Sequence, residues 1–252
     1  MATPPKPKIP LEVDRSLEEI LDESEILRAA PNLAKAALEG IGLLHITIEE
    51  EPKDLDETNT LAAWACLFGL TNHLWVDVVI ETDMDVGRKA FCSVTHTYKA
   101  TYGDASDFLR EVVNLMRAGV NKHLSDKGIN CVSPARPIDV PKGNIHAINF
   151  YSTPKLRIYL RAEGYWFIVT LFTHKQTPEP THLGLLREYD ISLESIMAME
   201  GSDLEILAGG VILTKDWIER LRSRFIYEEE FKQILIVTPP PVSTLFHANF
   251  EQ

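Results

Sequence analysis

The sequence lacks the short motifs that mark common enzyme families. It has no Gly-x-Ser-x-Gly nucleophile turn, no His-Glu-x-x-His zinc motif and no Gly-x-x-x-x-Gly-Lys phosphate loop. It also has no apolar run near the roughly 20 residues that a bilayer-spanning helix needs, because its longest apolar stretches, 61–70 and 166–172, are far shorter. These absences leave the common hydrolase, nucleotide-binding and integral membrane classes without support.

Cysteine is scarce as well. Cys66, Cys92 and Cys131 are odd in number and far apart, which argues against a disulfide framework and predicts reduced thiols. The first ten residues contain four prolines and two lysines, without the apolar core of a secretory signal. We therefore expect a cytoplasmic protein, and no pattern predicts a cofactor or a metal.

Proline marks both ends of the chain and one internal stretch. A disordered arm is predicted over 1–10, and Pro239-Pro240-Pro241 begins a tail over 239–252. A linker is predicted over 133–142, between an N-terminal α+β part, 11–132, and a C-terminal α+β part, 143–238. One compact domain is the alternative. Both proline-rich ends are candidates for docking on this subunit, on a neighbouring copy or on another protein.

Periodicity predicts an α+β fold, in which an antiparallel sheet packs with N- and C-terminal helices. The sheet is predicted as a hairpin near 73–98 and a meander near 145–173, with a tight turn at Ala162-Glu163-Gly164. Helical spacing of apolar residues predicts helices at 16–28, 33–38, 60–69, 107–124, 191–199 and 214–225, the last with Thr214 as its N-cap. A short strand is predicted at 43–48, and 231–237 reads as a helix end or an edge strand.

Charge is sorted along the chain. Residues 1–87 carry 6 Lys and Arg against 18 Asp and Glu, residues 88–175 carry 13 against 6, and residues 176–252 carry 6 against 13. The segment charges of −12, +7 and −7 add to the net charge of −12. A basic middle between acidic flanks needs an anionic partner, which is either the chain itself or something outside it.

The basic charge falls mainly on two predicted elements. Three cations and a tyrosine share one face of the strand near 155–161: Lys155, Arg157, Tyr159 and Arg161. The predicted helix 107–124 adds three cations on its exposed side: Arg110, Arg117 and Lys122. Cations interleaved with aromatic rings are typical of surfaces that bind RNA, and an anionic membrane surface is a second candidate. The alternative is that these cations pair with the acidic helix 18–25 or the charged loop 49–57.

The predicted hairpin holds the best cluster of reactive side chains. If Glu81 lies opposite Arg88, then Asp77 lies opposite Cys92 and His73 opposite His96, all near one face. Such a set could bind zinc or provide a Cys–His nucleophile and base. A slip of one residue would separate the four, and a core thiol is the simpler interpretation of Cys92.

Three functions remain open. The first is a self-assembling, non-enzymatic structural protein with a face for RNA or an anionic membrane, which has the general organisation of viral matrix or nucleocapsid proteins. The second is a cytosolic adaptor or regulator that binds protein partners through its proline-rich ends. The third is an enzyme with an unrecognised site near the 73–98 hairpin. The charge pattern favours the first, as a homo-oligomer.

Overall fold

The computed structural model describes residues 23–51, 59–134, 136–140, 154–197, 205–225 and 232–239. The predicted arm at 1–10, the tail beyond Pro239 and the predicted strand 145–151 lie outside the described residues. The division into two parts joined by a linker stays a prediction. Within the described ranges, no helix has the length and hydropathy needed to span a membrane.

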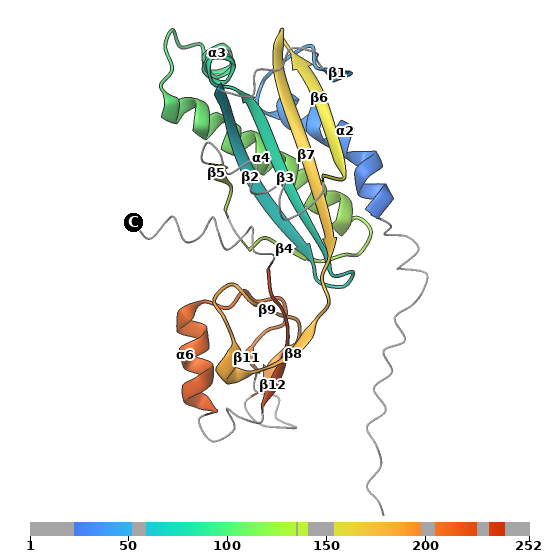
Figure 1. Ribbon diagram of the computed structural model, residues 1–252, viewed down its shortest axis with the longest axis vertical. Coiled ribbons are helices and arrows are strands. Elements are labelled where there is room, and N and C mark those ends of the chain that lie inside the picture. Colours follow the sequence, from blue (N-terminus) through green and yellow to red (C-terminus); the bar gives the residue numbers. More distant parts are fainter. Residues whose placement is uncertain are drawn as a thin grey trace, which may run out of the picture.

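A seven-stranded antiparallel sheet forms the centre of the fold (Figure 1). Its strands follow the order β1-β6-β7-β3-β2-β4, and β5 also pairs with β2. The bounds are β1 Thr47–Glu49, β2 Thr60–Gly69, β3 Leu74–Asp83, β4 Cys131–Val132, β5 Ile138–Val140, β6 Leu156–Ala162 and β7 Tyr165–Lys175. The predicted α+β class with an antiparallel sheet is confirmed. The β6–β7 hairpin turns where predicted, with positive φ angles of 50° at Glu163 and 88° at Gly164.

Three helices pack on one face of this sheet: α2 Glu23–Gly40, α3 Met84–Thr95 and α4 Tyr102–Ser125. The sequence predicts a break at Pro31, yet α2 runs through it. Pro31 costs about 3 kcal/mol in a helix interior. The buried positions on both sides of it, from Ile26 through Ala30 to Ala34, stay on one stripe that packs against the core, and this packing outweighs the lost hydrogen bond.

Helix α4 is the longest described helix and includes the predicted 107–124. It begins earlier than predicted because Thr101 and Asp104 form a capping box, in which each side chain bonds to the other residue's backbone N–H. Its inner side buries Phe108, Leu109, Val112, Val113, Met116 and Val120. The opposite side of α4 is therefore held in a fixed orientation toward solvent.

The C-terminal elements lie below the central sheet in Figure 1. Some of their residues pack against the sheet face that the helices do not cover. A three-stranded sheet has the order β8-β12-β9, and a two-stranded one joins β10 and β11. The bounds are β8 Glu179–His182, η2 Leu183–Leu185, β9 Ile191–Ser192, β10 Ile196–Met197, β11 Glu205–Leu207, α6 Lys215–Arg224 and β12 Gln233–Val237. Ile191 and Val237 pack against Trp64 and Trp75 of the central sheet.

Four predicted elements need correction or completion. Segment 60–69 is the central strand β2, not a helix, and 90–95 belongs to helix α3, not to a hairpin strand. Segment 191–197 contains the short strands β9 and β10 in place of a helix. The open alternative at 231–237 resolves to strand β12, which is central in its small sheet. Helix 214–225 is confirmed, with the Thr214 side chain accepting the Trp217 N–H.

Candidate functional site

The predicted hairpin cluster does not form. Because 84–95 is helical, Asp77 lies opposite Cys66 on β2 and Phe172 on β7 rather than opposite Cys92. Cys92 lies on α3, and His96 ends that helix in a left-handed conformation with φ 55°. His73 stacks against Phe68, with ring centroids 6.4 Å apart. Among the described residues, no three His, Cys, Asp or Glu side chains gather as a metal site.

Asp77 is instead a buried polar centre in the core. The Nε1 atoms of Trp64 and Trp75 each donate a hydrogen bond to its Oδ1 at 2.9 Å. His174 Nε2 lies 3.8 Å from Oδ2. Burial raises the pKa of Asp77 to about 7, although the two indole hydrogen bonds act in the opposite direction. The carboxyl is enclosed among large aromatic side chains, so this arrangement specifies the packing of the sheet face.

The basic strand lies on one face of the sheet, as predicted, but its charges are paired within the chain. Lys155 Nζ lies 3.4 Å from Glu23 Oε1 in the acidic helix, and Arg157 lies 3.8 Å from Glu81. The Arg161 guanidinium stacks over Trp166 at 5.6 Å from the ring centroid. Tyr159 is buried, and its pKa is raised first by that burial. The acidic and basic segments therefore meet in the fold, which is the alternative that the sequence left open.

The predicted cations of α4 are also engaged, apart from the exposed Lys122 near the end of the helix. Arg110 pairs with Asp107 on the helix, and its Nε lies 3.4 Å from Asp139 of β5. Arg117 donates to Asn114 Oδ1 and to Ser133 Oγ, both at 2.5 Å. These contacts tie α4 to the β4–β5 segment and leave little free positive charge.

The structure brings together a different set of side chains on α4. Five polar residues occupy neighbouring positions of its outer side, three or four residues apart, and we call them the α4 row: Asp107, Arg110, Glu111, Asn114 and Arg117. Asp107 and Glu111 are exposed, and the other three are partly exposed. Along about three helical turns the side chains of the row are in turn negative, positive, negative, neutral and positive.

Glu111 differs from its neighbours in the α4 row. Arg110 and Arg117 hold Asp107 and Asn114, whereas the Glu111 carboxylate makes no hydrogen bond or ion pair with any residue that the structure describes. Its carboxylate is thus available for contacts in trans. One helical turn away, the Asn114 carboxamide is fixed in orientation by Arg117. A carboxylate and an oriented carboxamide on an open surface can donate and accept hydrogen bonds. Together they can also hold a water molecule against the surface of another molecule.

Asp107, Glu111 and Asn114 were not among the predicted site residues. The net charge of the segment had pointed only to the cations of this helix. The signal that was present is the spacing of Asp107, Glu111 and Asn114 at i, i+4 and i+7, which places an acid, a second acid and an amide on one helix face.

No protein-family model matches the sequence, and the search of curated proteins found no match. Among solved structures, the chain is similar to a chain of the CheX–CheY–BeF3–Mg²⁺ complex from Borrelia burgdorferi, with 15% identity and a TM-score of 0.47 over 61% of this chain and 98% of that one. A CheC-like chemotactic protein from Shewanella oneidensis MR-1 has 11% identity and a TM-score of 0.46, over 61% and 100% of the two chains. The chemotaxis protein CheX from Vibrio vulnificus has 12% identity and a TM-score of 0.41, over 60% and 95%.

The prediction of a self-assembling, RNA-binding protein of viral matrix or nucleocapsid type is wrong. Its physical basis was a basic face free for an outside anion, and Lys155, Arg157 and Arg110 instead pair with carboxylates of the same chain. The predicted α+β class does not depend on a free basic face and is confirmed.

Proposed function

We propose that this protein is a regulator that acts by binding another protein through the α4 row. The observation that carries the proposal is Glu111, an exposed carboxylate without a partner among the described residues, set between Arg110 and Asn114, whose orientations are fixed. This corresponds to the second of the three functions left open by the sequence, with the contact moved from the proline-rich ends to a helix face.

The shape and rigidity of the α4 row support a protein partner. The row lies on the outer side of a helix, so it cannot enclose a small molecule, whereas a protein with a complementary recess can. The inner side of α4 is packed into the core through Phe108, Val112 and Met116. Because this packing holds the row in place before binding, little ordering entropy is lost on association.

The partner class follows from the charges and from one comparison. A surface that presents Asp107 and Glu111 beside Arg110 and Arg117 fits a recess with mixed charges, such as a phosphorylated acidic site with a neighbouring lysine. The CheX–CheY–BeF3–Mg²⁺ complex pairs a neighbour in fold with CheY, where BeF3 stands in for a phosphoryl group. We propose a CheY-type protein of the same cell as the first partner to test. The proposed location is the cytoplasm, where the thiols of Cys66, Cys92 and Cys131 would not be joined in disulfides.

Hydrolysis of the partner's phosphoryl group is the second candidate function. Glu111 and Asn114 lie one turn apart, which is the separation at which two oxygen-bearing side chains can hold one water between them. The carboxylate would accept a proton from that water, and the carboxamide would orient its oxygen toward phosphorus. The new P–O bond would form as the P–O bond to the partner's side chain breaks, which releases inorganic phosphate and the partner's free side chain. Under this proposal the α4 row completes a reaction site only when the partner is bound.

The experiment measures binding of the full chain to CheY-type proteins, with and without BeF3 and Mg²⁺, by isothermal titration calorimetry. Glu111→Lys is expected to weaken binding at least about tenfold, since loss of a central interface residue costs more than about 1.4 kcal/mol. Glu219→Lys, the same change at an exposed site on α6, serves as the matched control and should bind normally. Equal affinities for both variants would remove the α4 row as the interface.

A kinetic experiment tests separately whether the protein hydrolyses the partner's phosphoryl group. Phosphate release from the phosphorylated partner is followed with wild type, Glu111→Gln and Asn114→Ala. Hydrolysis in trans predicts that Glu111→Gln lowers the rate by about 100-fold or more while binding changes little, because the base is lost and the contact is kept. Normal release with Glu111→Gln would leave binding as the function and exclude the hydrolytic role.

A further inference from the structure

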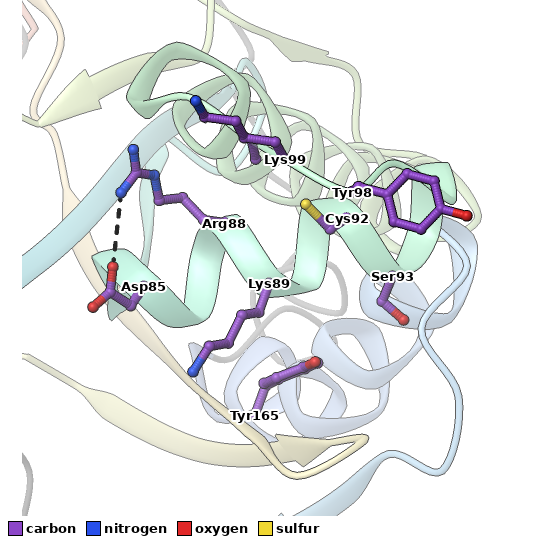
Figure 2. A pocket seen from close by; sticks show the side chains of 9 residues that line it. Asp85, Arg88, Lys89, Cys92, Ser93, Tyr98, Lys99 and Tyr165 are labelled. Atoms are coloured by element: carbon purple, nitrogen blue, oxygen red, sulfur yellow. Dashed lines mark ion pairs between the residues drawn. The ribbon is translucent and has the colours of Figure 1, made fainter.

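A cavity of about 590 Å³ opens on the exposed side of α3, away from the α4 row. Its walls come from α3, from the loop that leads to α4 and from the first residue of β7. Figure 2 shows the side chains around it, which include Arg88, Lys89, Cys92, Tyr98, Lys99 and Tyr165. The cavity is wide open to solvent, so a ligand bound there would stay partly exposed.

The cavity is cationic in an acidic protein. Among the described residues that line it, Arg88, Lys89 and Lys99 are basic and Asp85 is the one acidic residue. The net charge of the lining is therefore about +2, while the chain as a whole carries −12. Lys89 and Lys99 form no ion pair with any residue in the described ranges. Positive charge that the fold does not neutralise favours an anionic ligand.

Arg88 adds a second, independent observation. Its Nε atom is buried and has no hydrogen-bond partner among the described residues. One of its terminal nitrogens lies 3.8 Å from Asp85, so the guanidinium is held in place although its Nε–H has no acceptor among the described residues (Figure 2). The Arg88 side chain is 43% exposed, so its terminal nitrogens can still donate to an anion in the cavity.

Two tyrosines give the cavity an aromatic part. Tyr165 lies partly buried beside the cavity, on the side to which Lys89 extends (Figure 2). Tyr98 is fully exposed at the other end, where its ring makes no packing contact that would explain its position. Aromatic rings next to cations are suited to a planar group that carries negative charge.

We propose that this cavity binds a small phosphate monoester that carries a planar ring, of which a nucleoside monophosphate is the simplest common example. Arg88 and Lys99 contact the phosphate oxygens, and the tyrosine rings contact the planar group. The cavity shares no residue with the α4 row, so the proposal is independent of the proposed protein partner.

The test is calorimetric titration of the full chain with AMP, with inorganic phosphate and with adenosine. AMP is expected to bind at least about tenfold more tightly than either part, since both halves of the cavity contribute to its binding. Lys99→Ala and Arg88→Gln are each expected to weaken AMP binding about tenfold or more. Lys35→Ala, which removes a partly exposed lysine of α2 that does not line the cavity, is the matched control and should leave the affinity unchanged.

A second readout uses the natural protein. Cys92 lines the cavity, whereas Cys131 lies on β4 and Cys66 is buried. Saturating AMP should slow alkylation of Cys92 by iodoacetamide several-fold and leave the rate at Cys131 unchanged. The proposal is overturned if AMP does not saturate, if phosphate alone binds as tightly, or if Cys92 reacts at the same rate with and without AMP.

Discussion

The indole Nε1 of Trp64 donates a hydrogen bond to Oδ1 of Asp77 across strands β2 and β3, at 2.9 Å. Trp75 donates to the same oxygen from the same side of β3. Two neutral donors satisfy the carboxyl but do not supply a full positive charge, so burial dominates and raises the pKa of Asp77 to about 7. The sheet face thus contains a titrating group in the middle of an aromatic cluster.

Asp77→Asn is expected to flatten the pH dependence of stability. The folded pKa of about 7 lies above the ordinary value of 3.8, so the folded chain keeps a proton that the unfolded chain releases. Stability from Asp77 is therefore complete below the ordinary value and is lost as pH rises toward 7, by about 1.4 kcal/mol for each pKa unit. Asn keeps an acceptor for both indoles and does not ionise. Urea unfolding at a series of pH values measures the slope.

Glu188→Gln provides the control for this pH series, because Glu188 is an exposed carboxylate. It should keep the wild-type slope. Burial, followed by the charge of Lys155, lowers the pKa of His174, so stability from His174 is lost as pH falls below 6.5, in the wild type as in Glu188→Gln. An unchanged slope in Asp77→Asn would show that Asp77 does not titrate in this window.

Asp83→Ala is expected to destabilise the protein by about 1 kcal/mol through helix α3. The Asp83 carboxylate accepts the backbone N–H groups of Asp85 and Val86 at 2.8 and 3.2 Å, and these groups have no acceptor within the helix. Asp83→Asn keeps an acceptor and serves as the conservative control, with most of the stability retained. Equilibrium unfolding in urea gives the two values, and an equal loss in both variants would argue against a capping role.

The same cap explains why the sequence misplaced α3. Phe91, Val94 and Thr95 favour a strand by their side-chain shapes, and the preceding Asp83-to-Gly87 segment resembles a turn. The Asp83 cap and the buried positions at Gly87 and Ala90 instead start a helix that packs on the core. A side-chain cap of this kind can be predicted from sequence only where other signals already indicate the start of a helix.

Strand β2 shows a second limit of periodicity. Trp64 and Cys66 face the aromatic cluster, while Ala63 and Ala65 face the helices, so both faces are buried. A strand buried on both faces loses the alternation of polar and apolar residues, and its small residues then resemble a packed helix. By contrast, the β6–β7 hairpin could be predicted, because its turn residues and the alternation of its first strand agree.

The candidate site was less accessible from sequence than the fold. The one-face placement of Lys155 and Arg157 was predictable from strand parity, but their pairing with Glu23 and Glu81 depends on contacts between distant segments. Net charge by segment cannot distinguish a free cation from a paired one. The same holds for Glu111. Its carboxylate stands out only once the structure shows that neighbouring side chains such as Arg110 are paired and that Glu111 is not, among the described residues.

Ala34→Leu is expected to destabilise the protein by about 1 to 3 kcal/mol through overpacking. Ala34 is 1% exposed on the side of α2 that packs into the core, in a cluster that also contains buried residues of α4. Ala36→Leu makes the same change at an exposed position of the same helix and should alter stability by less than about 0.5 kcal/mol. Thermal and urea unfolding of both variants measure the difference. Similar values would mean that α2 does not pack as the structure shows.

A double-mutant cycle at Arg157 and Glu81 is expected to show coupling. Arg157→Ala removes the positive charge 3.8 Å from Glu81, whose side chain is 7% exposed, and should cost about 1 to 2 kcal/mol, because Arg157 itself is partly exposed to solvent. In a Glu81→Gln background the same change should cost less, since no buried charge is left behind. Arg161→Ala, which removes a cation stacked on Trp166, is the control and should show no coupling to Glu81. Additive losses at Arg157 and Glu81 would mean that the pair does not interact in solution, and the basic strand would then carry free charge.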